Sequence, residues 1–221
     1  QGERIAGLMG RIGIEDDMPI QHKMVSKTLE AAQKRVEGYN FDNRKNVVQY
    51  DNVINRHRRV VYTIRRKILE GEDIKAEIER LVEAKVRELT VVPAKNNKLF
   101  NDQFEEVFPI NDKKLKAIGA EKRDKNRYDL ALKEVKKLYA AKEEELETET
   151  LRKVEREVYL QVLDTLWMQH LENMQHLREG IHWRSVGQRD PLVEYRSESQ
   201  KLFDSLQGTL RDEVLRAIMH V

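Results

Sequence analysis

The stretch from Met24 to Leu69 constrains the fold most, because apolar side chains recur there at alternating steps of four and three residues. Side chains three and four apart share one face of an α-helix, so this period predicts one long helical rod with a single apolar seam. The seam positions are Val25, Leu29, Ala32, Val36, Tyr39, Asn43, Val47, Tyr50, Ile54, His57, Val61, Ile64 and Ile68. Gly38 lies inside the rod, where glycine costs roughly 1 kcal/mol relative to alanine, so we expect a weak point or bend there.

The composition is typical of long exposed helices. Of the 221 residues, 36% are charged and 6% are aromatic, and Gly and Pro together number 14. The sequence contains no cysteine, which excludes disulfides, thiolate metal sites and thiol catalysis. No apolar run reaches the length of a membrane-spanning helix, and no charged-then-apolar leader opens the sequence, so we expect a soluble, cytosolic protein.

Positive charge is concentrated in the rod. Residues 22–70 carry 12 Lys and Arg against 5 Asp and Glu, a balance of +7, although the whole chain has a net charge of only +2. A field of one sign attracts nucleic acid, anionic lipid or an acidic protein surface. A solvated face around the apolar seam explains the same pattern, and charge alone favours this simpler interpretation.

The segments on either side of the rod have a different character. Residues 1–21 are rich in glycine and acidic near their end, which is typical of a connector, and Pro19 favours extended backbone just before the rod begins. Residues 71–148 predict a small insertion of shorter charged helices. Phe100, Phe104 and Phe108 follow one another at helical spacing, so we expect them to form a small core separate from the seam of the rod.

Two further helices complete the predicted fold. Apolar residues recur at helical spacing from Leu151 to Ile181 and again from Leu192 to Ile218, and the short connection GIHWRSVGQRDP joins the two segments. Long helices joined by a short link return antiparallel, which predicts a hairpin with residues 181–190 at its tip. We therefore predict an all-α fold in which the long rod packs with a two-helix hairpin and carries an inserted helical domain.

The sequence predicts no catalytic residue and no metal site. It has no glycine-rich phosphate loop and no nucleophile elbow. His170, His176 and His182 recur every sixth residue, but six residues rotate a helix by about 600°, so these side chains point from different faces. The carboxylates of Glu155 and Glu157, like those of Glu194 and Glu198, are interpreted as surface charge, and the run of glutamates at 143–145 as a solvated face or joint.

The hairpin connection is the strongest candidate for a contact surface. It combines apolar Ile181, Trp183 and Val186 with cationic Arg184 and Arg189 in a link that we expect to be solvated. Exposed apolar side chains usually mark partner surfaces. The alternative, to which we give equal weight, is that Trp183 folds back onto the hairpin as a structural residue.

Two long segments resemble a known family. The rod segment QHKMVSKTLEAAQKRVEGYNFDNRKNVVQYDNV and the hairpin segment LDTLWMQHLENMQHLREGIHWRSVGQRDPLVEYRSESQKLF are similar to SecA, the ATPase motor of bacterial protein export. The dense matches are VEGYNFD-x-RK, LDTLWMxHL, LRxGIHxR and QxDPLxEY. Residues 71–148 resemble the family in position and helical character more than in motif.

The resemblance implies a domain organisation. Residues 1–21 would be the end of the second nucleotide-binding domain, residues 22–70 the long helix of the helical scaffold, residues 71–148 the helical wing domain, and residues 149–221 the two-helix finger of the scaffold. The nucleotide-binding motifs, and with them ATP and Mg²⁺, would lie outside this chain, which would itself be a non-catalytic part of the motor without a cofactor. The parent protein would be cytoplasmic and peripherally associated with the inner face of the membrane.

The resemblance also implies partners and site residues. The finger tip would contact the preprotein substrate and the SecYEG channel through Ile181, His182, Trp183, Arg184, Ser185, Val186, Gly187 and Gln188. The scaffold would contact the nucleotide-binding domains through Arg44, Lys45 and Asp51, with Trp167 packing behind Arg44; an anionic membrane surface is a further expected partner, and nucleic acid is not.

Two positions depart from the family pattern. Val186 stands where many relatives carry an aromatic tip residue, and Asn52 replaces the second Asp of the usual YDDV. The competing hypothesis is a free-standing basic helical scaffold that binds nucleic acid or an acidic protein.

Overall fold

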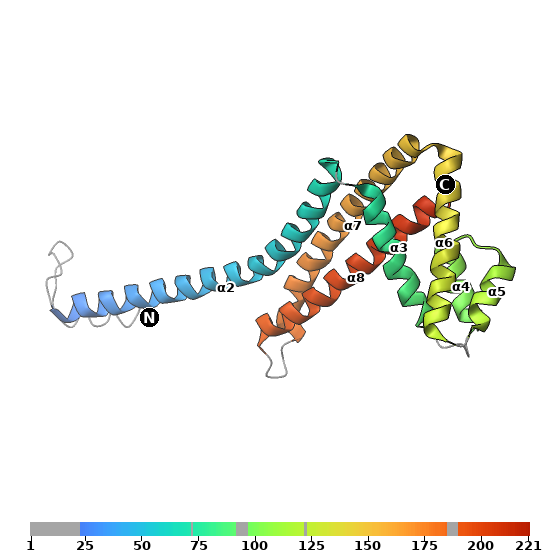
Figure 1. Cartoon of the computed structure of the whole chain (residues 1–221). Helices are drawn as coiled ribbons and strands as arrows, with labels where there is room; N and C mark the ends of the chain where they lie inside the picture. The colour runs from blue at the N-terminus through green and yellow to red at the C-terminus, as the bar shows by residue number, and fades with distance from the viewer. Residues whose placement is uncertain (1–22, 72, 92–96, 122, 185–189) are drawn as a thin grey trace. The chain divides into compact units, whose positions relative to one another are not determined.

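The described part of the chain is built from helices alone. A computed structural model describes residues 23–71, 73–91, 97–121, 123–184 and 190–221, and these contain seven α-helices and no strand (Figure 1). The predicted all-α fold is therefore confirmed. Two compact units, residues 1–51 and residues 52–221, divide the chain inside the first helix, and we describe each unit by itself.

The predicted rod is α2, which runs unbroken from Lys23 to Leu69 and continues through Gly38. In the first unit its apolar side chains are exposed, with Leu29 and Tyr39 each 68% accessible. In the second unit the seam is buried at Val61 and Ile68. The apolar stripe thus predicted the helix correctly along its whole length, whereas only its second half packs into a core.

A tight turn joins α2 to α3 (Ile74–Thr90). Gly71 has a φ of 85°, a left-handed conformation that glycine adopts without a steric penalty. Asp73 then caps α3, because its carboxylate accepts hydrogen bonds from the backbone N–H groups of Lys75 and Ala76 at 3.1 and 3.3 Å. These two residues end α2 and start α3.

Three helices follow α3 in the insertion. They are α4 (Asn97–Val107), α5 (Asp112–Ala120) and α6 (Asp124–Leu146), and α6 lies along α3 (Figure 1). Helix α4 also packs against α3, and α5 packs against α4 and α6. Arg127 is almost fully buried between them, where its guanidinium donates to the carbonyl oxygens of Thr90 and Glu121 at 3.0 and 3.2 Å. This side chain therefore bonds carbonyl oxygens at the ends of two helices, Thr90 of α3 and Glu121 just after α5.

The hairpin consists of α7 (Thr148–Arg184) and α8 (Pro191–Met219), which run antiparallel (Figure 1). Glu147, with a φ of 62°, separates α6 from α7 and lets the chain reverse direction. At the other end, Asp190 caps α8 by accepting from the backbone N–H of Leu192 at 2.8 Å, and Pro191 takes the first helical position.

One continuous core joins the insertion to the hairpin. Phe100, Phe104 and Phe108 are buried and pack ring against ring, as predicted, with centroids 5.4 and 5.2 Å apart. The expectation of a separate core is wrong, because these rings belong to the same cluster as Val61 and Ile68 of α2. The end of α8 supplies the bridge: Leu215, Ile218 and Met219 are fully buried in this cluster, and α8 packs against α3 and α4. The predicted domain limits stay a prediction.

Candidate functional site

The tip of the hairpin is the predicted contact surface, and the structure describes only part of it. Ile181 is 1% accessible, so its side chain belongs to the interior of the hairpin and is not presented to a partner. His182, Trp183 and Arg184 continue α7 as helix, but their side chains lie outside the described residues. Ser185, Val186, Gly187 and Gln188 lie outside the described residues altogether, and so does Arg189. Contact with a partner therefore stays a prediction for all of them.

An aromatic and imidazole cluster joins α2 to the hairpin within the second unit. Nδ1 of His57 on α2 lies 3.1 Å from Nε2 of His170 on α7. The ring of Phe203 on α8 stacks on His57 with a centroid separation of 4.2 Å and an interplanar angle of 4°. Trp167, one turn before His170, lies with its centroid 5.6 Å from that imidazole and meets Tyr62 edge-on at 6.3 Å. We call these five residues the imidazole cluster.

The two histidines of this cluster are held in the neutral form. His57 and His170 are 2% and 3% accessible. Burial, with a further contribution from the charge of His57, lowers the pKa of His170 to about 4. Burial and the nearby charge of Arg56 lower the pKa of His57, against an opposing effect of Asp204. At neutral pH one imidazole N–H therefore donates to the lone pair of the other ring.

Sequence reasoning did not identify this pair. His57 was placed in the apolar seam, and His170 was considered only as a metal ligand in a series with His176 and His182. The available signal was a histidine in a seam position, because a polar group in an apolar stripe needs a partner when it is buried. The described residues contain no group of three or more His, Cys, Asp or Glu arranged to hold a metal ion.

The predicted motor-contact residues lie in different compact units. Arg44 and Lys45 are exposed on α2 in the first unit, and Asp51 is half-buried there. Trp167 is 6% accessible in the second unit, where it packs in the imidazole cluster. The described contacts of Trp167 therefore give it a structural role in the scaffold, and its predicted position behind Arg44 stays a prediction.

A buried ionic joint fastens the start of the hairpin to the insertion. Arg152 of α7 donates to the carboxylates of Glu155 and Glu143 and to the hydroxyl oxygen of Tyr139, and that hydroxyl donates to Glu155 at 2.6 Å. Lys75 of α3 reaches Glu143 at 2.7 Å. The interpretation of Glu155 as surface charge is wrong: this side chain is fully buried and bonds both partners. Burial and the bond to Glu155 raise the pKa of Tyr139.

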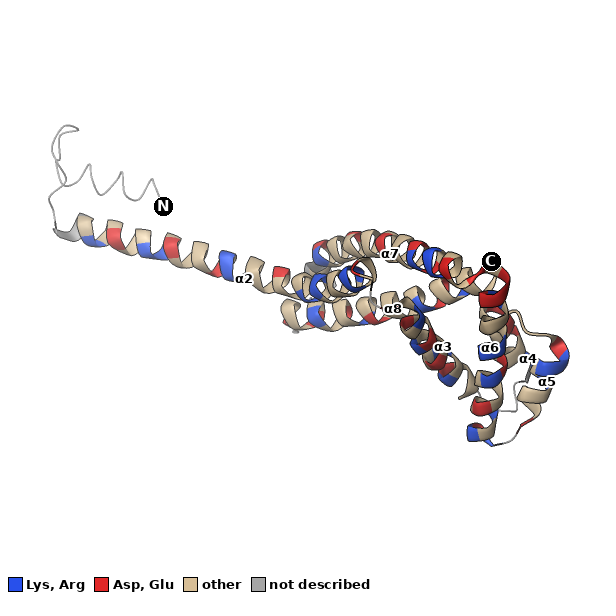
Figure 2. Ribbon diagram, turned by 45° about the horizontal axis from the view of Figure 1, so that its top comes forward, with Lys and Arg blue, Asp and Glu red and all other residues tan. Residues whose placement is uncertain are grey.

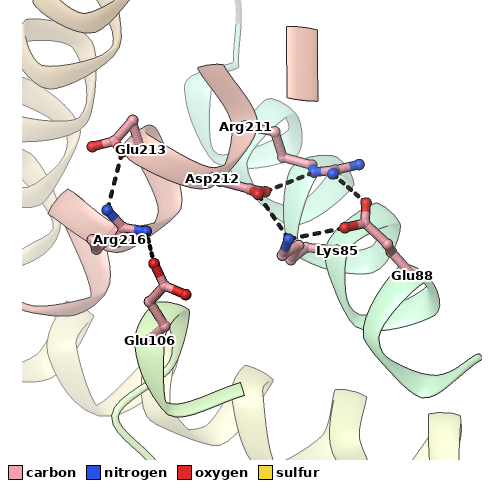
Figure 3. Close-up of polar contacts among 7 residues, drawn as sticks. All are labelled: Lys85, Glu88, Glu106, Arg211, Asp212, Glu213 and Arg216. Carbon is pink, nitrogen blue, oxygen red and sulfur yellow. Dashed lines mark hydrogen bonds and ion pairs between the residues drawn. The ribbon is translucent and has the colours of Figure 1, made fainter. Parts of the chain in front are cut away.

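A second ionic network links α3 and α4 to the end of α8 (Figure 3). Lys85, whose side chain is only 7% accessible, donates to Asp212 at 2.8 Å and to Glu88 at 3.0 Å. Arg211 bonds both of these carboxylates from α8. Arg216 of the same helix pairs with Glu106 of α4 and with Glu213. The insertion is thus connected to the hairpin by ion pairs as well as by the shared core.

Charge of both signs is interspersed on the other helices, whereas one part of α2 is strongly basic (Figure 2). Residues 52–69 carry six Lys or Arg and no acidic side chain, so most of the positive balance of the rod lies in its second half. Arg65 in this stretch pairs with Asp164 of α7 at 3.1 Å. No helix in the described ranges combines the length and the apolar character that crossing a membrane requires.

Comparison with known proteins identifies the family of the chain. A family model described as the SecA Wing and Scaffold domain matches residues 19–221. The chain belongs to the SecA family. It is 38% identical over 227 residues to the protein translocase subunit SecA of Carboxydothermus hydrogenoformans, and 34% identical over 227 residues to protein translocase subunit SecA 1 of Clostridioides difficile.

These alignments cover nearly all of the chain and a minor part of each relative. Each includes 99% of this chain but only 26% of the Carboxydothermus SecA and 25% of the Clostridioides SecA 1. The SecA of Pelotomaculum thermopropionicum gives the same result, with 38% identity, 99% of this chain and 26% of the relative. The chain therefore spans about a quarter of the length of these relatives and corresponds to the wing and scaffold part of SecA.

Proposed function

We propose that this chain is the coupling part of a SecA-type protein translocase, which passes ATP-driven domain motion to a polypeptide in a membrane channel. The observation that carries the proposal is the family match over residues 19–221, on a structure in which the long helices α7 and α8 form a hairpin. The family match favours this function over the alternative of a free-standing scaffold for nucleic acid or an acidic protein.

In this function the chain is a mechanical element without a catalytic role. ATP and Mg²⁺ would be bound by nucleotide-binding domains elsewhere in the translocase, and Arg44, Lys45 and Asp51 would face those domains. Trp167 would support the scaffold from inside the imidazole cluster. The translocase would work at the cytoplasmic face of the membrane, attached peripherally, with anionic lipid as a further partner of the basic stretch in α2.

The hairpin tip would contact the preprotein and the SecYEG channel. Because Ile181 is buried, we assign the contact to residues 182–188 and give Ile181 the role of anchoring the end of α7. Apolar and cationic side chains suit a chain of varied sequence, since neither requires strict geometry. Trp183→Ala separates contact from fold-back: a contact residue lowers polypeptide transport at unchanged melting temperature, whereas a folded-back residue lowers the melting temperature clearly.

A chimera tests the proposed function as a whole. The matching quarter of the Carboxydothermus SecA is replaced by this chain, and ATP-driven movement of a preprotein into SecYEG-containing vesicles is measured. Transport above that of a control in which residues 182–188 are replaced by Gly and Ser supports the proposal. A folded chimera that hydrolyses ATP but transports no more than the control contradicts it.

A further inference from the structure

The second half of α2 meets the hairpin through the apolar core at Val61 and Ile68 and through a pair of titratable rings. His57, His170 and Phe203 come from α2, α7 and α8, so this one cluster brings together all three long helices of the second unit. Around it, Tyr62 meets Trp167 edge-on, and Arg65 pairs with Asp164 at the exposed margin. Any change in the two imidazoles therefore acts directly on the join between rod and hairpin.

The geometry accepts one proton on the pair but not two. With both rings neutral, one N–H points at the lone pair of the other ring across 3.1 Å. With one proton added, a protonated ring still donates to a neutral ring. With both rings protonated, two N–H groups carrying positive charge face each other in a site that is almost inaccessible to water, and neither can accept.

The charged groups around the cluster do not compensate for a second proton. Arg56, which precedes His57 on α2, adds positive charge. Asp204 on α8 is the acidic group that acts on His57, and it also accepts a hydrogen bond from Gln200 at 2.8 Å. Trp167 and Phe203 supply apolar walls without charge.

We propose that His57 and His170 form a proton-sensitive clasp, which fixes residues 52–69 of α2 to the hairpin while the pair holds no more than one proton and releases them when both rings are protonated. This inference goes beyond the proposed function and does not depend on it. The clasp is closed at neutral pH, so the second half of α2 and the hairpin behave there as one body.

The direction of the pH effect follows from the lowered pKa values. Both histidines have a pKa below the ordinary value of 6.5, and that of His170 is about 4. Between about pH 4 and pH 6.5 the closed form therefore binds fewer protons than the open form. The closed form has its full stability above pH 6.5. That stability is lost as the pH falls from 6.5 through about 4.

Two measurements on the chain test the clasp. Because the sequence contains no cysteine, spin labels at Arg66→Cys on α2 and Glu172→Cys on α7 report their separation without background labelling. We expect one narrow distance distribution at pH 7 that becomes broad and longer between pH 6 and pH 4. Nuclear magnetic resonance titration of the histidines should show His170 taking up its proton near pH 4 and His57 taking up its proton below the ordinary range of a histidine.

Matched variants assign the transition to the pair. His57→Phe keeps a flat ring against Phe203 but removes one of the two protonation sites. The distance distribution of this variant should therefore not broaden between pH 6 and pH 4. His176→Gln is an exposed change on α7, the helix of His170, and should leave the pH-dependent broadening unchanged. A label pair at Glu172 and Arg196, both within the hairpin, should show no increase in distance.

Three results would overturn the proposal. One is an unchanged distance distribution in the parent chain at pH 4, and another is a transition in His57→Phe identical to that of the parent. The third is independent titration of both histidines near 6.5. If His57→Phe does not fold, the distance and titration curves of the parent chain decide between the clasp and a pair that is only structural.

Discussion

At the residue scale, several buried polar groups hold the helices together because each has charged or hydrogen-bonding partners on a neighbouring element. Glu155 bonds Arg152 and Tyr139, Lys85 bonds Asp212 and Glu88, and Arg127 caps the end of α3. Each group loses its hydration on folding, so each depends on its partners for the free energy of the folded state. Removing one partner leaves the other buried and unpaired.

Glu155 gives a direct prediction for stability. Glu155→Ala leaves Arg152 without one carboxylate and the buried hydroxyl of Tyr139 without its acceptor. Loss of one member of a buried pair typically costs about 3 kcal/mol of unfolding free energy. Chemical denaturation should show this loss, while Glu157→Ala, an exposed glutamate two residues along α7, should change the free energy by less than about 0.5 kcal/mol. Equal effects in the two variants would mean that the joint contributes nothing specific.

At the element scale, apolar periodicity predicted the helices well, and contact between elements was harder to predict. The stripe from Met24 to Leu69, the turn at Gly71 and the hairpin all follow from local rules of spacing and capping. Apolar periodicity identifies the apolar face of a helix but not the element that packs against that face. It therefore could not show that Tyr39 is exposed while Ile68 is buried, or that the phenylalanine rings join the main core.

The candidate site, too, could be predicted from the sequence only in part. The connection GIHWRSVGQRDP was identified from sequence as a hairpin tip, and the structure has α7 and α8 on its two sides, but α7 continues into it as far as Arg184 and α8 begins at its last residue, Pro191. The burial of Ile181, the pairing of His57 with His170 and the joint around Glu155 all depend on residues distant in sequence. A single sequence does not show which distant residues form such pairs.

The network between α3 and α8 can be tested by exchanging charges. Lys85→Glu places three carboxylates together with Glu88 and Asp212, and Asp212→Lys places three cations together with Lys85 and Arg211, so each single change should lower the unfolding free energy. The double change restores opposite charges and should recover about 1–2 kcal/mol relative to the sum of the single changes. Thermal and chemical unfolding of the four proteins measures this coupling. Simple additivity of the two changes would show that the ion pair does not hold the helices together.

At the scale of the whole molecule, the second unit is one connected body. The shared core, the joint at Arg152 and the network at Lys85 fasten the insertion to the hairpin, and the imidazole cluster fastens residues 52–69 of α2 to it. A displacement applied to this part of α2 would therefore reach the hairpin without loss in a flexible joint. This rigidity suits the coupling role that we propose for this part of a SecA-type translocase.

Contact with the nucleotide-binding domains gives a prediction in the complete translocase. In the chimera described above, Arg44→Ala should change the basal rate of ATP hydrolysis, because it removes a cation that we propose pairs with a group on those domains. Its melting temperature should stay unchanged, since Arg44 is exposed. Lys34→Ala, on the same helix and paired only at the surface with Glu30, is the matched control. A rate identical to that of the parent chimera would argue against the assignment of Arg44.

Photo-cross-linking at the hairpin tip tests whether the tip contacts the preprotein or the channel, as we propose. A photoreactive amino acid is placed at Val186 of the chimera, and at Lys153 in a control, and each is irradiated during transport of a labelled preprotein through SecYEG. Lys153 is exposed near the start of α7, roughly 45 Å along the helix from Arg184 at a rise of about 1.5 Å per residue. We predict ATP-dependent adducts with preprotein or channel from Val186 and none from Lys153. No adduct from Val186 during active transport, or equal adducts from both positions, would contradict this proposal.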